Sequence, residues 1–417
     1  MNELFKNSTR LLSANMIAQA IGLLVYPILT RIYTPEDFGL LNLMLSISSI
    51  LVLLSTGEYQ YAQVLAPTER KAQAAMKCSL WILLVVTALV VCSISCRKPI
   101  AHLCKTSEIE EFWWIMPILV FVSGFWTILN YHWTRQKDFK HISSYQIIQS
   151  SVTSVSKIGM GVAGWTASGL IISTLIGPMV GIVSTCLGWW KELKNITTIP
   201  SSEVRDVAHE YKNLPCFSLP RALVNNLSNS APALLLTPFF GTFELGFFAM
   251  AITLAFRPIN MIIGSIYQVL FQHITELFHN KQPIFGFIKR FVAKEMVVVL
   301  LFFLALYFIL PWLCGFLLGE EWTLCGQYIR WMLPWLALTC INGIFCFLAD
   351  IFNKQKIGFV FEIIILLARV AGLSYGIVTK SFENAVIGFS IMSAAALLCQ
   401  LIWFVRLVQR YELSLRQ

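Results

Sequence analysis

The chain has 417 residues, of which 57% are hydrophobic and only 13% are charged, and its mean hydropathy is +0.70. A soluble domain normally carries about 25% charged residues, and apolar runs of bilayer-crossing length recur along this whole sequence, so the composition excludes a soluble protein and predicts an all-α polytopic membrane protein. The net charge of +9 would indicate a nucleic-acid partner in a soluble chain, but membrane topology explains most of it here and we expect no nucleic-acid partner.

Hydropathy predicts about twelve transmembrane helices. In chain order they are expected at residues 11–31, 39–57, 76–96, 112–132, 143–164, 168–190, 215–238, 245–270, 291–312, 327–350, 357–378 and 384–405. The eleven cysteines form no C-x-x-C pair, so neither a metal site nor a disulfide framework is indicated. We expect no metal and no cofactor.

The connection between the first two spans, residues 30–41 (TRIYTPEDFGLL), carries the signals of a helix start. Thr34 is suited to cap a helix, Pro35 fits the first helical position, and Asp37 follows the cap by three residues as in a capping box. Gly39 is expected to let this helix pack closely on a neighbour.

A second version of this connection lies 207 residues later. There Thr237, Glu244 and Gly246 take the places of Thr30, Asp37 and Gly39. Each version lies between apolar runs of matching length. The register predicts an internal repeat of two six-helix bundles, residues 1–200 and 201–417.

The lysine and arginine residues predict the orientation. Of the 31 in the chain, 21 fall in the termini and connections on one side, 5 on the other side, and 5 within spans. Because cations concentrate on the cytoplasmic side, both termini are predicted to be cytoplasmic. The longest hydrophilic connection, at about residues 191–214, lies on the same side, between spans six and seven.

The five cations within spans are the first candidates for function. A charge at mid-bilayer costs about 2.5–3.5 kcal/mol on insertion scales, so such a residue usually faces a partner or a water-filled cavity. Structural ion pairing is the alternative, and Arg221 and Arg330 are also placed where they can extend to an interface. The five are Lys157, Arg221, Arg257, Arg330 and Arg369, and all but Arg330 are predicted to serve a cavity that binds an anion.

Polar side chains also recur at four-residue spacing, which places them on one helix face. Amides and hydroxyls at this depth suit sugar hydroxyls or water, whereas the alternative is hydrogen bonding between helices, typically worth less than about 1 kcal/mol per bond. These stripes are Arg221, Asn225 and Asn229 in span seven, Gln149, Thr153 and Lys157 in span five, and Asn15 and Gln19 in span one.

Several glycine patterns also fall within spans. Gly159 to Gly164 matches G-x-G-x-x-G but does not follow a strand, so we interpret it as small residues for helix packing. Gly372 to Gly376 matches G-x-S-x-G by chance, since no strand-to-helix elbow surrounds it. Gly177 and Gly181 predict a close contact between helices.

Residues 29–39 (LTRIYTPEDFG) resemble the opening of the polysaccharide-biosynthesis flippases of the multidrug/oligosaccharidyl-lipid/polysaccharide exporter superfamily. The resemblance implies a non-enzymatic flippase of the bacterial cytoplasmic (inner) membrane with a cationic central cavity. It would move undecaprenyl-pyrophosphate-linked oligosaccharide repeat units, for O-antigen or capsule, to the outer leaflet by alternating access. Arg257 matches the kind of cavity arginine that such flippases use. The bilayer, and the polymerase and glycosyltransferases of the same pathway, are the further partners that the resemblance implies.

Two other functions stay open. A cation-coupled drug or small-solute exporter of the same superfamily is disfavoured because spans one and seven hold no acidic residue. A membrane polysaccharide polymerase or ligase needs catalytic polar groups on a sizeable external loop, and the longest one here is only residues 97–111. Lipid II is disfavoured as the substrate, because lipid II flippases carry several arginines in spans one and two, whereas span one here has only Arg31, at its outer end.

Overall fold

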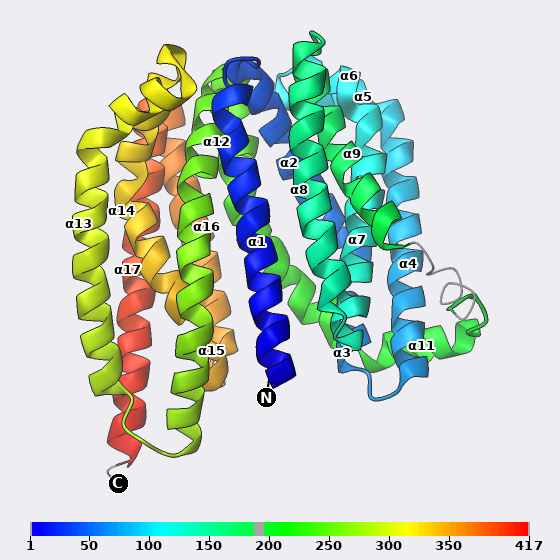
Figure 1. Ribbon diagram of the computed structural model, residues 1–417, viewed down its shortest axis with the longest axis vertical. Helices are drawn as coiled ribbons and strands as arrows, with labels where there is room; N and C mark the ends of the chain where they lie inside the picture. Colours follow the sequence, from blue (N-terminus) through cyan, green and yellow to red (C-terminus); the bar gives the residue numbers. More distant parts are fainter. Residues whose placement is uncertain (1, 187–195, 416–417) are drawn as a thin grey trace. The chain divides into compact units, whose positions relative to one another are not determined.

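The structure, a computed structural model, describes residues 2–186 and 196–415 (Figure 1). The described residues contain no β-strand. The main helices are α1 (Asn2–Leu29), α2 (Pro35–Thr56), α3 (Gln60–Leu65), α4 (Glu69–Cys92), α5 (Arg97–Cys104), α6 (Glu108–Phe112), α7 (Met116–Gln136), α8 (Phe139–Val162), α9 (Ala167–Thr185), α11 (Ser201–Glu210), α12 (Leu219–His279), α13 (Phe285–Leu318), α14 (Thr323–Phe345), α15 (Leu348–Ile351), α16 (Gln355–Val378) and α17 (Phe382–Leu415).

These helices confirm an all-α polytopic membrane protein with about twelve spans. The long α12 supplies two of them, because its backbone leaves the helical region at Gly241 (φ 83°, ψ −179°), between the predicted spans seven and eight. Nine segments within the described ranges have the length and apolar composition to cross a membrane. The more polar α8 is not among the nine, and α1 contributes only the shorter apolar segment Ser13–Leu29.

The outer surface of α13 is the clearest sign of a lipid environment. Leu301, Phe308, Trp312 and Phe316 are between 61% and 73% exposed. A continuous apolar surface of this kind is unfavourable in water, but it matches the hydrocarbon interior of a bilayer.

The chain forms two compact units, Met1–Gly246 (unit 1) and Phe247–Gln417 (unit 2). The predicted bundles have a different boundary, between residues 200 and 201, and stay a prediction. The first part of α12 groups with unit 1 because it is bonded to α2. The hydroxyl of Ser49 donates to the amide oxygen of Asn226 at 3.0 Å.

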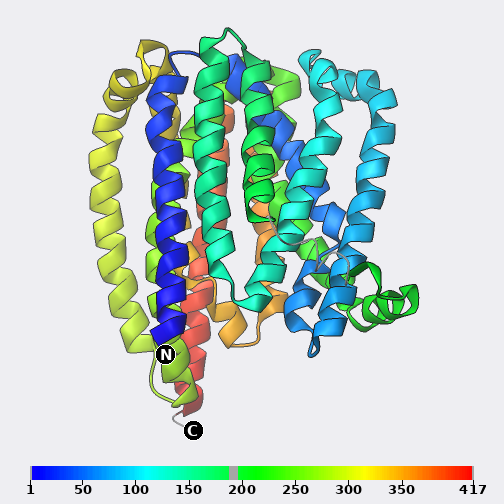
Figure 2. The same ribbon diagram turned by 45° about the vertical axis from the view of Figure 1, so that its right-hand side comes forward.

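Within unit 1, α8 packs between α1 and α9, and α2 packs on α4 and α7 (Figure 2). Gly177 and Gly181 of α9 confirm the predicted close contact. A Cβ added at Gly177 would lie 2.7 Å from the carbonyl oxygen of Gln149 in α8, and one at Gly181 would lie 2.8 Å from the ring of Tyr145. The small residues therefore allow the backbones of these two helices to approach closely.

The connection between spans six and seven contains a docked amphipathic helix, α11. Its Val204 and Val207 are buried against α3 and α4, together with Tyr59, whose hydroxyl donates to the carbonyl of Ala208 at 3.0 Å. On the exposed side, Glu203 accepts two hydrogen bonds from the guanidinium of Arg70, at 2.6 and 2.7 Å. Residues 187–195 of the same connection lie outside the described residues.

Within unit 2, α14 packs on α13 and α17, and α16 packs on α17. The contact between α16 and α17 is again close, because Gly372 faces Gly388 and Gly376 faces Ala385, backbone against backbone. This arrangement fixes which face of α16 points into unit 2.

Candidate functional site

The first connection folds as its sequence predicts. Thr34 has extended backbone angles, its hydroxyl accepts from the backbone N–H of Asp37 at 3.3 Å, and the Asp37 carboxylate accepts from the N–H of Thr34 at 2.9 Å. Pro35 occupies the first turn of α2. The capping box is therefore confirmed, and it fixes the point at which α2 begins.

Gly39 and its repeat counterpart Gly246 meet at one helix crossing. A Cβ on Gly39 would clash with the carbonyl oxygen of Thr242 and would lie 3.0 Å from the backbone nitrogen of Gly246. A Cβ on Gly246 would clash with the carbonyl oxygen of Pro35. The predicted close packing of Gly39 is confirmed, and its partner is the second copy of the same motif.

The polar segment of α12 presents two different faces. Arg221, Asn225 and Asn229 are all exposed, and the Asn229 side-chain amide donates to the Asn225 amide oxygen at 3.2 Å. We call these three residues the α12 polar face. On the neighbouring face, Asn226 and Ser230 approach α2. Asn226 and Ser230 thus form hydrogen bonds between helices, which is the alternative role for polar residues at this depth. The α12 polar face, in contrast, stays exposed.

The predicted polar stripe lies on α8, which packs against α1 on one side and α9 on the other. Thr153 lies against Gly177 of α9, and Ser150 donates to the carbonyl of Ala18 in α1 at 2.7 Å. Lys157 is half-buried, and its carbonyl accepts from the Tyr33 hydroxyl at 2.7 Å. This environment favours helix packing as the role of Thr153.

The remaining unit 1 candidates differ in exposure. Asn15 on α1 is exposed, whereas Gln19 on α1 and Gln149 on α8 are half-buried. Asn15 is therefore the most accessible of these three amides.

In unit 2, the two candidate arginines have different surroundings. Arg257 is half-buried, whereas Arg369 is only 8% exposed. The Arg369 guanidinium lies 5.5 Å from the ring centroids of both Trp335 and Phe389, within the range of a cation–π interaction. Trp335 also contacts Phe256, at 5.1 Å between ring centroids. One tryptophan thus links Arg369 to the residue next to Arg257.

Trp335 and Phe389 were missed by reasoning from the sequence. They are aromatic residues within apolar spans, and nothing in their spacing distinguishes them from ordinary core residues. Arg330, which was expected to have the weakest role, lies with its guanidinium 4.2 Å from the ring centroid of Tyr307. This distance is within the range of a cation–π interaction, and the contact joins α13 and α14.

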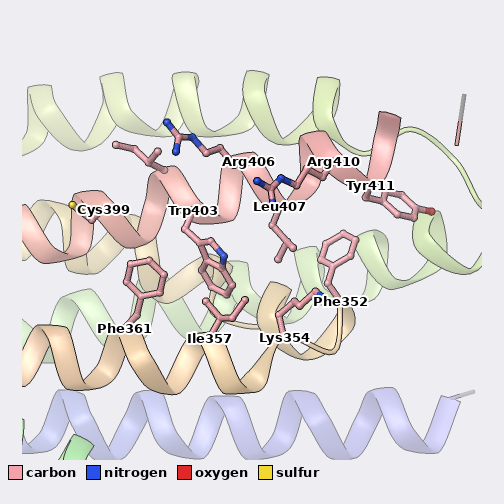
Figure 3. A pocket seen from close by; sticks show the side chains of 11 residues that line it. Phe352, Lys354, Ile357, Phe361, Cys399, Trp403, Arg406, Leu407, Arg410 and Tyr411 are labelled. Carbon is pink, nitrogen blue, oxygen red and sulfur yellow. The ribbon is translucent and has the colours of Figure 1, made fainter. Parts of the chain in front are cut away.

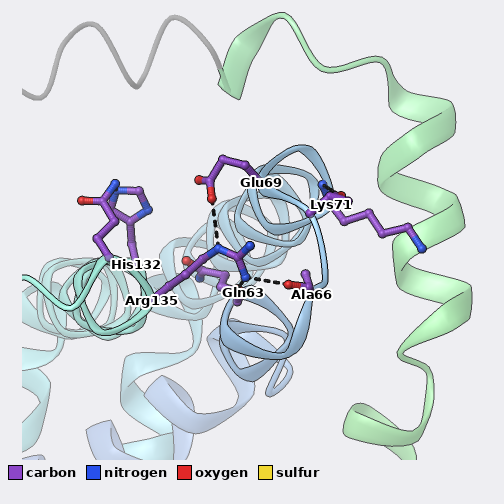
Figure 4. A network of polar contacts seen from close by, with 8 residues as sticks. Gln63, Ala66, Glu69, Lys71, His132 and Arg135 are labelled. Atoms are coloured by element: carbon purple, nitrogen blue, oxygen red, sulfur yellow. Dashed lines mark hydrogen bonds and ion pairs between the residues drawn. The ribbon is translucent and has the colours of Figure 1, made fainter. Parts of the chain in front are cut away.

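A polar clamp closes the end of α3 in unit 1 (Figure 4). The Arg135 guanidinium donates to the carbonyls of Gln63 and Ala66, both at 2.7 Å, and to the Glu69 carboxylate at 3.0 Å. Carbonyls at a helix C-terminus lack intrahelical partners, and a cation there compensates them. We therefore assign Arg135 to holding α3 against α4 and α7.

Among the described residues, no group of three or more His, Cys, Asp or Glu side chains is arranged to hold a metal ion. The polar groups of the candidate site are cations and amides. Their chemistry is that of binding anions and hydroxyl-rich molecules.

The sequence and the fold both have relatives. The family model described as Polysaccharide biosynthesis protein matches residues 28–327, whereas no curated protein matches the chain significantly. The lipid II flippase MurJ in an inward closed conformation has a similar fold, with a TM-score of 0.75 at 12% identity over 96% of this chain and 89% of that one.

Transporters of the MATE family share the fold as well. An inward-facing multidrug resistance MATE transporter of the MOP superfamily gives a TM-score of 0.67 at 11% identity, over 96% of this chain and 95% of that one. An outward-facing one gives 0.60 at 14% identity, over 98% and 96%. The family model covers most of the sequence, and this chain therefore belongs to the polysaccharide biosynthesis protein family.

Proposed function

We propose that this protein is a flippase that moves undecaprenyl-pyrophosphate-linked oligosaccharide repeat units, of O-antigen or capsule, from the inner to the outer leaflet of the bacterial cytoplasmic membrane. It works by alternating access, with both termini in the cytoplasm and without enzymatic chemistry. The family and the fold support a transporter of polysaccharide precursors. The observation that carries the proposal is the exposed α12 polar face.

An exposed cation and two exposed amides are poorly suited to face lipid. Placing a charged group against hydrocarbon is costly, so the exposed α12 polar face favours water or a polar substrate beside it. Two asparagines supply donors and acceptors for sugar hydroxyls. Arg221 supplies a charge-assisted donor for phosphate. This combination fits the head of a lipid-linked oligosaccharide, whose apolar tail stays in the bilayer.

The other candidates receive roles according to their exposure. Arg257 and Lys157, both half-buried, supply positive charge for the pyrophosphate, as Arg221 does. Gln149, Asn15 and Gln19 add amides for the sugars. Arg369 is a positioning residue, because it is buried against Trp335 and Phe389 and acts through them on the surroundings of Arg257.

The membrane potential favours this direction of transport. An inside-negative potential contributes about 2.3 kcal/mol per charge per 100 mV. It drives the anionic head outward and returns the empty cationic site inward. In this proposal, glycosyltransferases supply the lipid-linked units to this protein, and a polymerase receives them from it.

A drug or small-solute exporter is the second candidate, because MATE transporters share the fold. Such a cation-coupled transporter needs an acidic group to bind the coupling ion or a cationic drug. The α12 polar face carries a cation and amides instead. It therefore favours an anionic, hydroxylated substrate.

The test replaces the amides of the α12 polar face. Asn225→Ala/Asn229→Ala is expected to reduce surface polysaccharide at least tenfold in a deletion strain complemented with the variant, because the amides proposed to contact the sugars are removed from an exposed helix face. Quantitative sugar analysis of the cell surface measures the effect, with membrane protein levels checked by immunoblot.

The matched control is Asn213→Ala/Asn280→Ala, which removes two exposed asparagines outside the spans. Surface polysaccharide in the control should equal that of wild type. Wild-type output from the Asn225→Ala/Asn229→Ala variant would remove the α12 polar face from the substrate path.

A further inference from the structure

A pocket of about 630 Å³ opens between α16 and α17 in unit 2, and none of the proposed substrate residues lines it (Figure 3). Eleven residues line it. Three of them are basic, namely Lys354, Arg406 and Arg410, and none of the eleven is acidic. The pocket therefore combines positive charge with an otherwise largely apolar lining.

Four aromatic side chains are among those that line this pocket. Trp403 of α17 points toward Phe361 and Ile357 of α16 (Figure 3), and the rings of Phe361 and Trp403 have centroids 5.1 Å apart. Phe352 and Tyr411 form a second pair, at 5.3 Å. Ile357 is 41% exposed, so apolar surface remains accessible beside the rings.

The three cations are available for a ligand. Lys354, Arg406 and Arg410 are all exposed, and within residues 2–186 and 196–415 no carboxylate forms an ion pair with them. Lys354 and Arg410 approach the pocket from opposite sides, Lys354 just before α16 and Arg410 from α17 (Figure 3). An anion between them would receive two charge-assisted contacts.

A second pocket at this end of unit 2 offers a comparison. It measures about 580 Å³ and is lined by Arg290, Lys294 and the acidic Glu412. The carboxylate of Glu412 accepts from the backbone N–H of Phe285 at 3.2 Å. A fixed negative charge makes this second pocket the poorer anion site, so the pocket between α16 and α17 is the better candidate.

The location of the pocket identifies the class of ligand. The positive-inside distribution predicts this end of unit 2 to be cytoplasmic, where tryptophan and tyrosine mark the level of the lipid headgroups. Anionic lipids of the inner leaflet are attracted to basic pockets between transmembrane helices. Free phosphate would leave the aromatic lining without a contact, whereas a lipid brings both a phosphate and an acyl chain.

We propose that the pocket between α16 and α17 binds an anionic membrane phospholipid, with its phosphate between Lys354 and Arg410 and an acyl chain along Trp403 and Phe361. Arg406 adds positive charge from α17. The pocket lining shares no residue with the proposed substrate site, and the proposal holds whether or not the protein flips lipid-linked oligosaccharide.

The test measures lipid retention by the full-length protein. Protein purified in detergent is incubated with phosphatidylglycerol or with phosphatidylcholine of the same acyl chains, and bound lipid is counted by native mass spectrometry. Lys354→Gln/Arg410→Gln is expected to weaken phosphatidylglycerol binding roughly thirtyfold, as two cations at a membrane surface predict. Phosphatidylcholine should bind wild type and variant equally.

The matched control is Arg205→Gln/Lys212→Gln, which removes two exposed cations from the connection that contains α11. Its phosphatidylglycerol affinity should stay within about threefold of wild type, as expected for cations outside the pocket. Phe361→Ala tests the acyl-chain contact and should weaken both headgroup classes alike.

Three results would overturn the proposal. The first is equal loss of phosphatidylglycerol in the pocket variant and the control. The second is equal affinity of wild type for the two lipids. The third is displacement of phosphatidylglycerol by another phosphate compound. Displacement by inorganic phosphate at equal concentration would identify a free-phosphate site. Displacement by undecaprenyl phosphate at far lower concentration would make the pocket part of the substrate path.

Discussion

Gly39 and Gly246 show how much a single hydrogen atom in place of a side chain matters. A Cβ on Gly39 would meet the backbone of Thr242, and one on Gly246 would meet the backbone of Pro35. Backbone atoms cannot move aside as the end of a side chain can. Gly39→Ala is expected to destabilise the protein by about 1–3 kcal/mol, as overpacking does. A thermal-unfolding scan in detergent, followed by intrinsic tryptophan fluorescence, would record this as a lower midpoint.

The control for this substitution lies in α8. Apart from its own helix backbone, Gly159 has no atom within 4 Å of the position where a Cβ would be, so the helix packing expected of this glycine is not seen. A helical Ala is favoured over Gly by about 1 kcal/mol. Gly159→Ala should therefore unfold at the wild-type temperature or above it. If Gly39→Ala and Gly159→Ala unfold together, the crossing of α2 and α12 is looser than described.

At this scale the sequence predicts what depends on neighbours along the chain. Thr34, Pro35 and Asp37 specify a capping box by spacing alone, because every partner lies within three residues. Asn225 and Asn226 are adjacent and chemically identical, so the sequence cannot assign their faces. Their difference arises from Ser49, which lies 177 positions away from Asn226 in the chain.

Helix α11 shows what the sequence does not predict about a single helix. Low hydropathy predicts a hydrophilic connection, yet Val204 and Val207 make one face apolar enough to dock on α3 and α4. Helix formation follows from packing that apolar face against the rest of the fold. The four-residue spacing of polar side chains in α12 and α8 can likewise be recognised in the sequence. Which helix packs against each face depends on the tertiary structure.

The docking of α11 predicts its protection from protease. Val204→Asp/Val207→Asp is expected to release the helix, because charged groups replace buried apolar ones. Trypsin should then cut after Arg205 at least tenfold faster than in wild type, as measured by mass spectrometry of timed digests. Size-exclusion chromatography before digestion confirms that the membrane part stays folded.

The comparison variant is Arg70→Gln, which breaks the exposed pair with Glu203. The hydrogen bond from Arg70 lowers the pKa of Glu203, so the pair is intact at neutral pH and is lost only in acid, as the pH falls through that depressed pKa. Exposed pairs contribute little to stability, so cleavage should change by less than about fivefold. If Val204→Asp/Val207→Asp is cleaved as slowly as Arg70→Gln, contacts other than those of the two valines hold α11.

At the scale of the whole molecule, the membrane fold was largely predictable. Twelve apolar runs and a 207-residue repeat follow from hydropathy and spacing, since a bilayer imposes its thickness on every helix. The break at Gly241 falls where the spans seven and eight were separated. The boundary between bundles, the sided topology and the substrate residues depend on long-range arrangement, and they stay predictions.

We propose that this protein carries lipid-linked repeat units across the membrane, with Arg257 holding the pyrophosphate. The most direct measurement locates those units by leaflet in membrane vesicles from a deletion strain, complemented with wild type, with Arg257→Ala or with the control Arg330→Ala. We predict unpolymerised units on the inner leaflet in the deletion and in Arg257→Ala, and normal export with wild type and Arg330→Ala. Unpolymerised units on the outer leaflet of the deletion strain would contradict a flippase, and normal export by Arg257→Ala would contradict the role of that arginine.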